Sequence, residues 1–207
     1  MSIVKLNNKA VSNATAFGSI TSLGSMVFIK KLTASSSATL SFVDGTDGVV
    51  LDDTYKEYVF TFNNIHPATD NTGFQFNLSI DSGSNYNVTK TSTAFGAYHG
   101  EADNGAGLEY SSSQDLAQGT GYQNLCNADN GSDADQSVSG SMSLFNPSST
   151  TFVKHWISQF CGNAQENTNR NFLTAGYGNT VSAVNAIRFQ MSSGNIDAGD
   201  ICLYGIA

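Results

Sequence analysis

The amino-acid sequence predicts an all-β fold, specifically an antiparallel, jelly-roll-like β-sandwich. Segments of alternating apolar and polar residues recur along the 207 residues, and turns rich in Gly, Asp, Asn and Ser separate them. Helical periodicity is nearly absent, and only 108–118 and 180–187 offer enough of it for a short turn of helix. No 40-residue repeat is visible, which favours a sandwich over a propeller.

The first element, residues 1–25, shows weak alternation and many small residues. Two interpretations stay open for it: an ordinary first strand, or an assembly arm that lies on a neighbouring subunit. The sandwich domain is expected to comprise residues 26–207.

The strands that follow are expected to place one row of side chains in a shared core. The clearest case is 74–80, where Phe74, Phe76, Leu78 and Ile80 should face inward and Gln75, Asn77 and Ser79 outward. Segment 151–157 is apolar on both faces apart from Lys154 and His155, which predicts a central strand buried on both sides. Three further segments show the same alternation: 37–43 (Ala38, Leu40, Phe42), 57–63 (Tyr58, Phe60, Phe62) and 137–145 (Val138, Met142, Leu144).

The last two strands are expected at 187–191 and 201–206, joined by a small polar connection. A strand that runs to the end of a chain is an aggregation hazard when it forms an open sheet edge. The C-terminal strand is therefore expected to be paired inside a sheet.

The net charge is −8, although charged residues make up only 13% of the chain. Between Lys90 and Lys154 there is no Lys or Arg but there are seven carboxylates. This distribution argues against nucleic-acid binding, which needs clustered basic residues. A neutral-polar surface is common where a protein packs against copies of itself or meets neutral ligands.

The three cysteines, Cys126, Cys161 and Cys202, are widely spaced and odd in number, which predicts free thiols rather than disulfides or a zinc site. The N-terminus does not have the pattern of a signal peptide, and no segment approaches the length of a membrane span. Synthesis in a reducing cytoplasm without membrane insertion is therefore expected.

Five segments resemble small structural proteins of marine tailed bacteriophages of the cyanophage and pelagiphage type. They are TASSSATLSF (33–42), TYKEYVFTFNNIHPATD (54–70), GSNYN (83–87), FNPSSTTFVKHWIS (145–158) and MSSGNIDAGDICLYGI (191–206). The last segment looks like the closing hairpin of phage tail and appendage domains. The resemblance implies a virion β-sandwich, carried on the tail, a tail fibre or the capsid exterior as decoration.

An acidic stretch at 129–135 loosely resembles a calcium loop, with Asp129, Asp133 and Asp135 as ligands and Gly131 at the turn. Calcium takes six or more oxygen ligands, and the spacing here is not that of an EF-hand. A solvated turn is the alternative interpretation, and no other cofactor is expected.

Tyrosines beside Gly, Asn or Ser suggest contacts with a host surface glycan, because aromatic faces stack on sugar rings. The candidate contacts are Tyr98, Tyr110, Tyr122, Tyr177 and Trp156. The alternative is that many of these rings belong to the core or to subunit contacts.

Three function classes follow. The first is a non-enzymatic virion structural protein that forms homo-oligomers, with a trimer as first guess, and contacts other virion proteins. Its loops 96–136 and 159–180 would face outward and contact the host surface. The second is a carbohydrate-binding module for a host glycan. The third is a polysaccharide depolymerase with Glu101 and Glu109 as candidate carboxylates.

Overall fold

The structure is a computed structural model that describes residues 25–207. No helix in this range is long and apolar enough to cross a membrane. The strands are β1 (Met26–Thr33), β2 (Leu40–Val43), β3 (Glu57–Pro67), β4 (Phe74–Ser79), β5 (Lys90–Gly100), β6 (Ala106–Tyr110), β7 (Gln123–Asn124), β8 (Val138–Phe145), β9 (Lys154–Ala164), β10 (Thr168–Gly178), β11 (Ala186–Met191) and β12 (Ile196–Ile206). The short helical turns expected at 108–118 and 180–187 do not form there, because these segments contribute to β6, loops and β11.

The strands form two antiparallel sheets that pack face to face, which confirms the predicted β-sandwich. One sheet has eight strands in the order β1-β12-β3-β8-β9-β10-β5-β6, and the other has four in the order β2-β11-β4-β7. The chain alternates between the sheets, since β1, β3, β8 and β12 lie together in the first and β2, β4, β7 and β11 make up the second.

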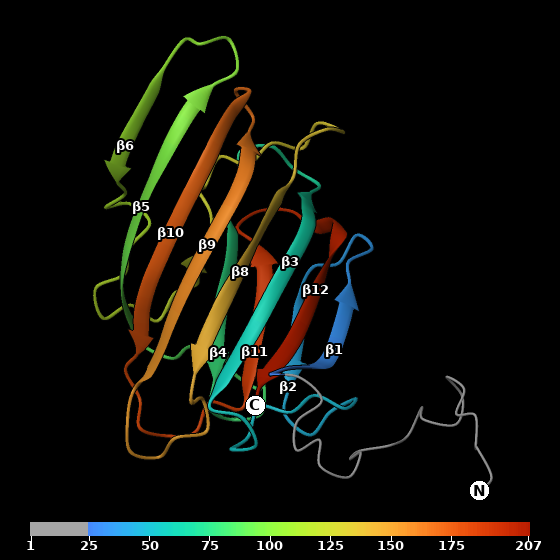
Figure 1. The fold of residues 1–207 in the computed structure, drawn as a ribbon, viewed down its shortest axis with the longest axis vertical. Helices are drawn as coiled ribbons and strands as arrows, with labels where there is room; N and C mark the ends of the chain where they lie inside the picture. The colour runs from blue at the N-terminus through green and yellow to red at the C-terminus, as the bar shows by residue number, and fades with distance from the viewer. Residues whose placement is uncertain (1–24) are drawn as a thin grey trace, which may run out of the picture.

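Two hairpins, β5–β6 and β9–β10, widen the larger sheet. Figure 1 shows β5, β6 and β10 extending to the left of the small sheet, whose strands β4, β11 and β2 lie behind β8, β3 and β12. The expectation that 159–180 is a loop is therefore wrong, because this range holds the end of β9 and all of β10. Range 96–136 holds the end of β5, all of β6 and the short β7, and the rest of it is loop, as expected.

The core between the sheets is built from phenylalanines of both. The ring of Phe62 on β3 lies 5.5 Å from Phe74 on β4, 5.0 Å from Phe160 on β9 and 5.1 Å from Phe189 on β11. All four rings are buried, and such aromatic clusters add specific edge and face contacts to the burial of apolar area. The alternation in 57–63, 74–78 and 137–145 therefore found the core face. In 37–43 it holds for Leu40 and Phe42, whereas the prediction for Ala38 is wrong, because Ala38 is exposed and lies before β2 begins.

Where the small sheet ends, the segment from Ser111 to Ser137 covers the inner face of the larger sheet with polar groups. The Oγ of Ser92 on β5 donates to Oε1 of Gln123 at 2.6 Å, and Nε2 of Gln123 donates to the carbonyl of Gln114 at 2.9 Å. All three side chains are buried. Buried polar groups need such partners, so this half of the interior is held by hydrogen bonds more than by apolar packing.

The C-terminal strand is paired on both sides, as expected. β12 lies between β1 and β3, with Tyr204 opposite Phe28 and Val59. However, β11 and β12 belong to different sheets, so 187–206 is a crossover between sheets and not the closing hairpin that the resemblance implied.

The strand at 74–79 differs from its predicted pattern on one face. Asn77 and Ser79 are fully buried, and Ile80 is 43% exposed. Asn77 Nδ2 donates to the carbonyls of Tyr86 and Thr120, because the chain after β4 folds back over this side of the small sheet. Ile80 already belongs to the turn that starts this return.

The question of a strand or an arm at 1–25 concerns residues that, apart from Ser25, lie outside the described range.

Candidate functional site

The outward-facing side of the larger sheet is one candidate functional surface. On β9, Trp156 and Phe160 face the core, which turns Ile157 and Gln159 to the opposite side. The strand register then aligns outward-facing neighbours in rows across the sheet. One row runs from Ser143 through Ile157 and Ala175 to Thr93.

We define the outer face as the outward-facing residues of β8, β9, β10, β5 and β6. They are Ser139, Ser141, Ser143, Phe145, His155, Ile157, Gln159, Cys161, Asn163, Asn169, Asn171, Leu173, Ala175, Tyr177, Thr91, Thr93, Phe95, Ala97, His99, Ala106, Leu108 and Tyr110. None of them is Lys, Arg, Asp or Glu, although the chain carries a net charge of −8. The charged residues of these strands, Lys90, Glu109, Lys154 and Arg170, belong to the opposite, inward-facing rows.

The outer face exposes large apolar side chains. Ile157 is 56% exposed, Phe95 42% and Leu108 80%. An exposed apolar surface without charges is typical of an interaction site, since interface centres are depleted of charged residues. Segment 151–157 is therefore not buried on both sides, as the sequence had predicted. Ile157 is exposed because only the inner side of the sheet is covered, and Phe152 is exposed in the loop before β9.

Charged residues begin at the β3 side of this face. Glu57 on β3 accepts a hydrogen bond of 2.7 Å from Ser143 Oγ, and Lys31 on β1 pairs with Asp200 on β12 at 3.2 Å. The uncharged outer face is therefore bordered by charged residues on β1, β3 and β12.

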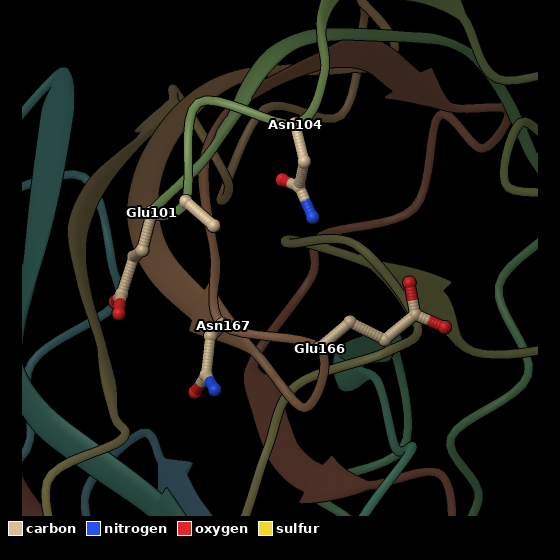
Figure 2. Close-up of a pocket in the computed structure, with 5 residues that line it drawn as sticks. Glu101, Asn104, Glu166 and Asn167 are labelled. Carbon is tan, nitrogen blue, oxygen red and sulfur yellow. The ribbon is translucent and has the colours of Figure 1, made fainter.

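The second candidate surface is a polar cleft at one end of the larger sheet. It lies between the β5–β6 turn, with Glu101 and Asn104, and the β9–β10 turn, with Glu166 and Asn167, and its cavity volume is about 380 Å³. Figure 2 shows the carboxylates of Glu101 and Glu166 on different sides of this cleft. Tyr98, Thr168 and Arg170 line an adjoining hollow that shares Asn104 and Glu166.

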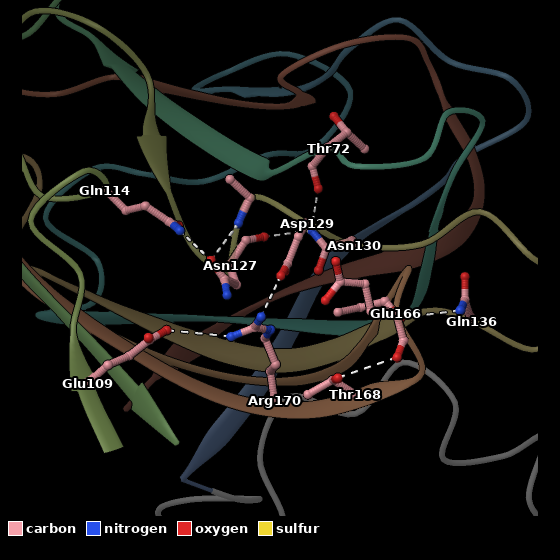
Figure 3. Close-up of polar contacts among 12 residues, drawn as sticks. Thr72, Glu109, Gln114, Asn127, Asp129, Asn130, Gln136, Glu166, Thr168 and Arg170 are labelled. Atoms are coloured by element: carbon pink, nitrogen blue, oxygen red, sulfur yellow. Dashed lines mark hydrogen bonds and ion pairs between the residues drawn. The ribbon is translucent and has the colours of Figure 1, made fainter. Parts of the chain in front are cut away.

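Arg170 connects this end of the sheet to the segment that covers its inner face (Figure 3). Its Nη2 lies 2.6 Å from Asp129 Oδ2 and its Nη1 lies 3.4 Å from Glu109 Oε1. Asp129 Oδ1 and Arg170 Nε are buried without a hydrogen-bond partner. Burial raises the pKa of Asp129 above its usual value, and the nearby guanidinium opposes that shift.

The five aromatic residues predicted to contact glycan do not form one site. Tyr98 lines the hollow that adjoins the cleft, with the guanidinium carbon of Arg170 at 5.3 Å from its ring centre. Tyr110 and Tyr177 lie on the outer face, and Tyr122 lies in the loop before β7. The prediction for Trp156 is wrong, because its ring is 1% exposed and packs against Phe76 in the core.

The predicted calcium ligands lie in the segment between β7 and β8. Asp129 is engaged by Arg170, whereas Asp133 and Asp135 are exposed in the next turn. Within residues 25–207, no group of three or more His, Cys, Asp or Glu side chains is placed to hold a metal ion. The calcium loop stays a prediction.

Several residues of these two surfaces were not singled out from the sequence. Ile157 was assigned to a buried strand, and Leu173 and Arg170 lie in a segment that was taken as a loop. The alternation Trp156–Ile157–Ser158–Gln159–Phe160 does carry a signal for an exposed Ile157, because Ser158 is small enough to be packed inside. Comparison with protein-family models, with curated proteins and with solved structures finds no match for this chain.

Proposed function

We propose that this protein is a non-enzymatic structural subunit of a bacteriophage virion that acts through contacts with other subunits. The observation that carries the proposal is the outer face, whose outward-facing residues expose apolar side chains and include no Lys, Arg, Asp or Glu. An exposed apolar surface without charges is typical of a site that another protein covers, since covering it removes apolar area from water. The location on a tail, a fibre or the capsid exterior, and the surface-attachment role, belong to the same proposal.

The jelly-roll assignment is part of this proposal. It is supported by the alternation of eight strands between the sheets in the orders β1-β12-β3-β8 and β2-β11-β4-β7, which two Greek keys would generate. The hairpins β5–β6 and β9–β10 would then be additions that enlarge one sheet and create the outer face.

Labelling purified phage particles with an antibody against this protein tests the proposal. We expect gold particles at one defined position, the tail tip, the tail base or the capsid, and a band of the expected mass in the purified particles. Particles without the protein would contradict the proposal.

Binding of a host surface glycan is a second candidate function, and the polar cleft supports it. Asn104, Glu166, Thr168 and Arg170 present hydrogen-bonding groups next to the ring of Tyr98, a combination that suits sugar hydroxyls and a sugar face. Glu109 would be a poor catalytic acid for a depolymerase, since Arg170 holds it as an ion pair.

A glycan array with the wild-type protein and two variants tests this second function. Glu166→Gln and Asn104→Ala change exposed side chains of the cleft. We expect both to weaken the binding of any glycan retained by the wild type at least tenfold. Unchanged binding in both variants would remove the cleft as the glycan site.

A further inference from the structure

We propose that the outer face pairs face to face with the outer face of a second copy of this chain, forming a two-fold symmetric dimer. This inference rests on the proposed function, because it names the surface and the partner of one of the subunit contacts. Two antiparallel sheets pack in this way in any β-sandwich, at a separation of about 10 Å.

Electrostatics favour a second copy as the occupant. A chain with a net charge of −8 repels its own copies wherever carboxylates meet. The outer face is free of carboxylates, so two copies can approach through it without placing like charges in the contact. Glu57 lies at its border, where solvent screens the charge.

The size of the outer face also fits a stable dimer. Five strands at ~4.8 Å spacing, with ~3.3 Å for each residue, span roughly 700 Å². A standard protein interface buries about 800 Å² on each partner. One outer face therefore supplies nearly the area that a self-association needs.

The side chains near the centre are suited to a two-fold axis. β10 is the middle of the five strands, and Leu173 and Ala175 lie midway along it. Leu173 is flanked by Gln159 on β9 and Phe95 on β5. Around a two-fold axis, this small apolar centre would contact its own copy, and the surrounding Ser, Thr, Asn and Gln side chains would pair across the rim.

Cys161 provides a reporter in the wild-type chain. It is exposed on the outer face of β9, whereas Cys126 and Cys202 are buried. Burial raises the pKa of the Cys126 thiol to about 11, which further suppresses its reaction. Labelling by a bulky maleimide therefore reports access to Cys161.

The test combines sedimentation of the full chain over a concentration series with the rate of maleimide labelling. Ile157→Lys places a charge on the outer face, and Val181→Lys places the same charge on the β10–β11 loop. The two positions are matched, since Ile157 is 56% exposed and Val181 is 57% exposed. Gln159→Glu adds a charge to the outer face with almost no change of shape, so it serves where Ile157→Lys fails to fold.

We expect the wild type and Val181→Lys to dimerise. As the dimer forms, the rate of maleimide labelling at Cys161 should fall at least tenfold in both proteins. Ile157→Lys and Gln159→Glu should weaken dimerisation at least 100-fold and 10-fold, respectively, and restore fast labelling. Oligomers that neither variant affects would overturn the face-to-face contact and leave the proposed function standing. A monomer with a protected Cys161 would assign the face to another segment of the same chain and overturn the dimer. A monomer with a freely reactive Cys161 would also overturn the dimer. The proposed function is tested separately, and it would be overturned only if phage particles lack the protein.

Discussion

Arg170 on β10 and Asp129 in the segment before β8 form an ion pair with 2.6 Å between Nη2 and Oδ2. The contact ties the covering segment 111–137 to the inner face of the enlarged sheet. Because one oxygen of Asp129 is buried without another partner, the guanidinium is the main compensation for its buried charge.

Replacement of Arg170 by Met should lower the free energy of unfolding by about 1–3 kcal/mol, since it leaves the Asp129 carboxylate partly buried and unpaired. Adding Asp129→Asn to this variant should recover part of the loss, because an amide is less costly to bury than a carboxylate. Denaturant titration of the two single variants and the double variant measures this coupling. An Arg170→Met variant as stable as the wild type would show that the pair contributes nothing.

Stability should rise with pH between about pH 7 and pH 9, because of Lys90. Its Nζ is buried against Asn77 Oδ1 at 2.5 Å and the carbonyl of Val88 at 2.8 Å, and burial lowers its pKa from 10.5 to about 7. Above pH 7 the unfolded chain therefore binds more protons than the folded chain, so the free energy of unfolding increases by up to about 1.4 kcal/mol for each pH unit.

The measurement is a series of denaturation curves from pH 6.5 to 9, in which Lys90→Met should flatten the rise. Above pH 9 the raised pKa of Cys126 acts in the opposite direction, because the unfolded thiol then loses its proton first. Equal slopes in wild type and Lys90→Met would assign the pH dependence to other groups.

Gly176→Ala should destabilise the protein by about 1–3 kcal/mol through overpacking. A Cβ at this position would lie 2.7 Å from two ring carbons of Trp156 and still closer to the carbonyl oxygen of Thr91. Gly121→Ala is the control, since a Cβ there would meet nothing within 4 Å. Thermal unfolding should therefore separate the two variants, and similar melting temperatures would contradict the close packing under Trp156.

Phe189→Ala should cost about 3–5 kcal/mol of stability, because it empties the centre of the phenylalanine cluster. Phe189 lies within 6.3 Å, between ring centres, of Phe42, Phe60, Phe62 and Phe74. Phe152→Ala is the matched control, since Phe152 is 69% exposed and its removal should change stability by less than about 0.5 kcal/mol. Urea titration at constant pH compares them, and a loss of less than about 1 kcal/mol for Phe189→Ala would argue against this core.

The local alternation of apolar and polar residues was sufficient to predict the β-sandwich and the core-facing side of most strands. Alternation placed Phe42, Phe60, Phe62, Phe74 and Phe76 in the core, because a strand that is covered on one side alternates in polarity with a period of two residues. The sequence also predicted that the C-terminal strand is paired inside a sheet, because an unpaired strand there would form an open edge prone to aggregation, and β12 is paired on both sides.

The other side of each strand depended on which segments distant in the sequence came to cover it. Asn77 is polar yet buried, because the return after β4 lies over it, whereas Ile157 is apolar yet exposed, because nothing in the described chain covers the outer face. The pairing of Arg170 with Asp129 likewise joins residues 41 positions apart. The sequence by itself therefore determined the fold class and most of the core-facing residues of the alternating strands, which follow from local alternation. Only the tertiary structure decided where the cleft and the uncharged face lie, since both arise from how strands are ordered and covered in space.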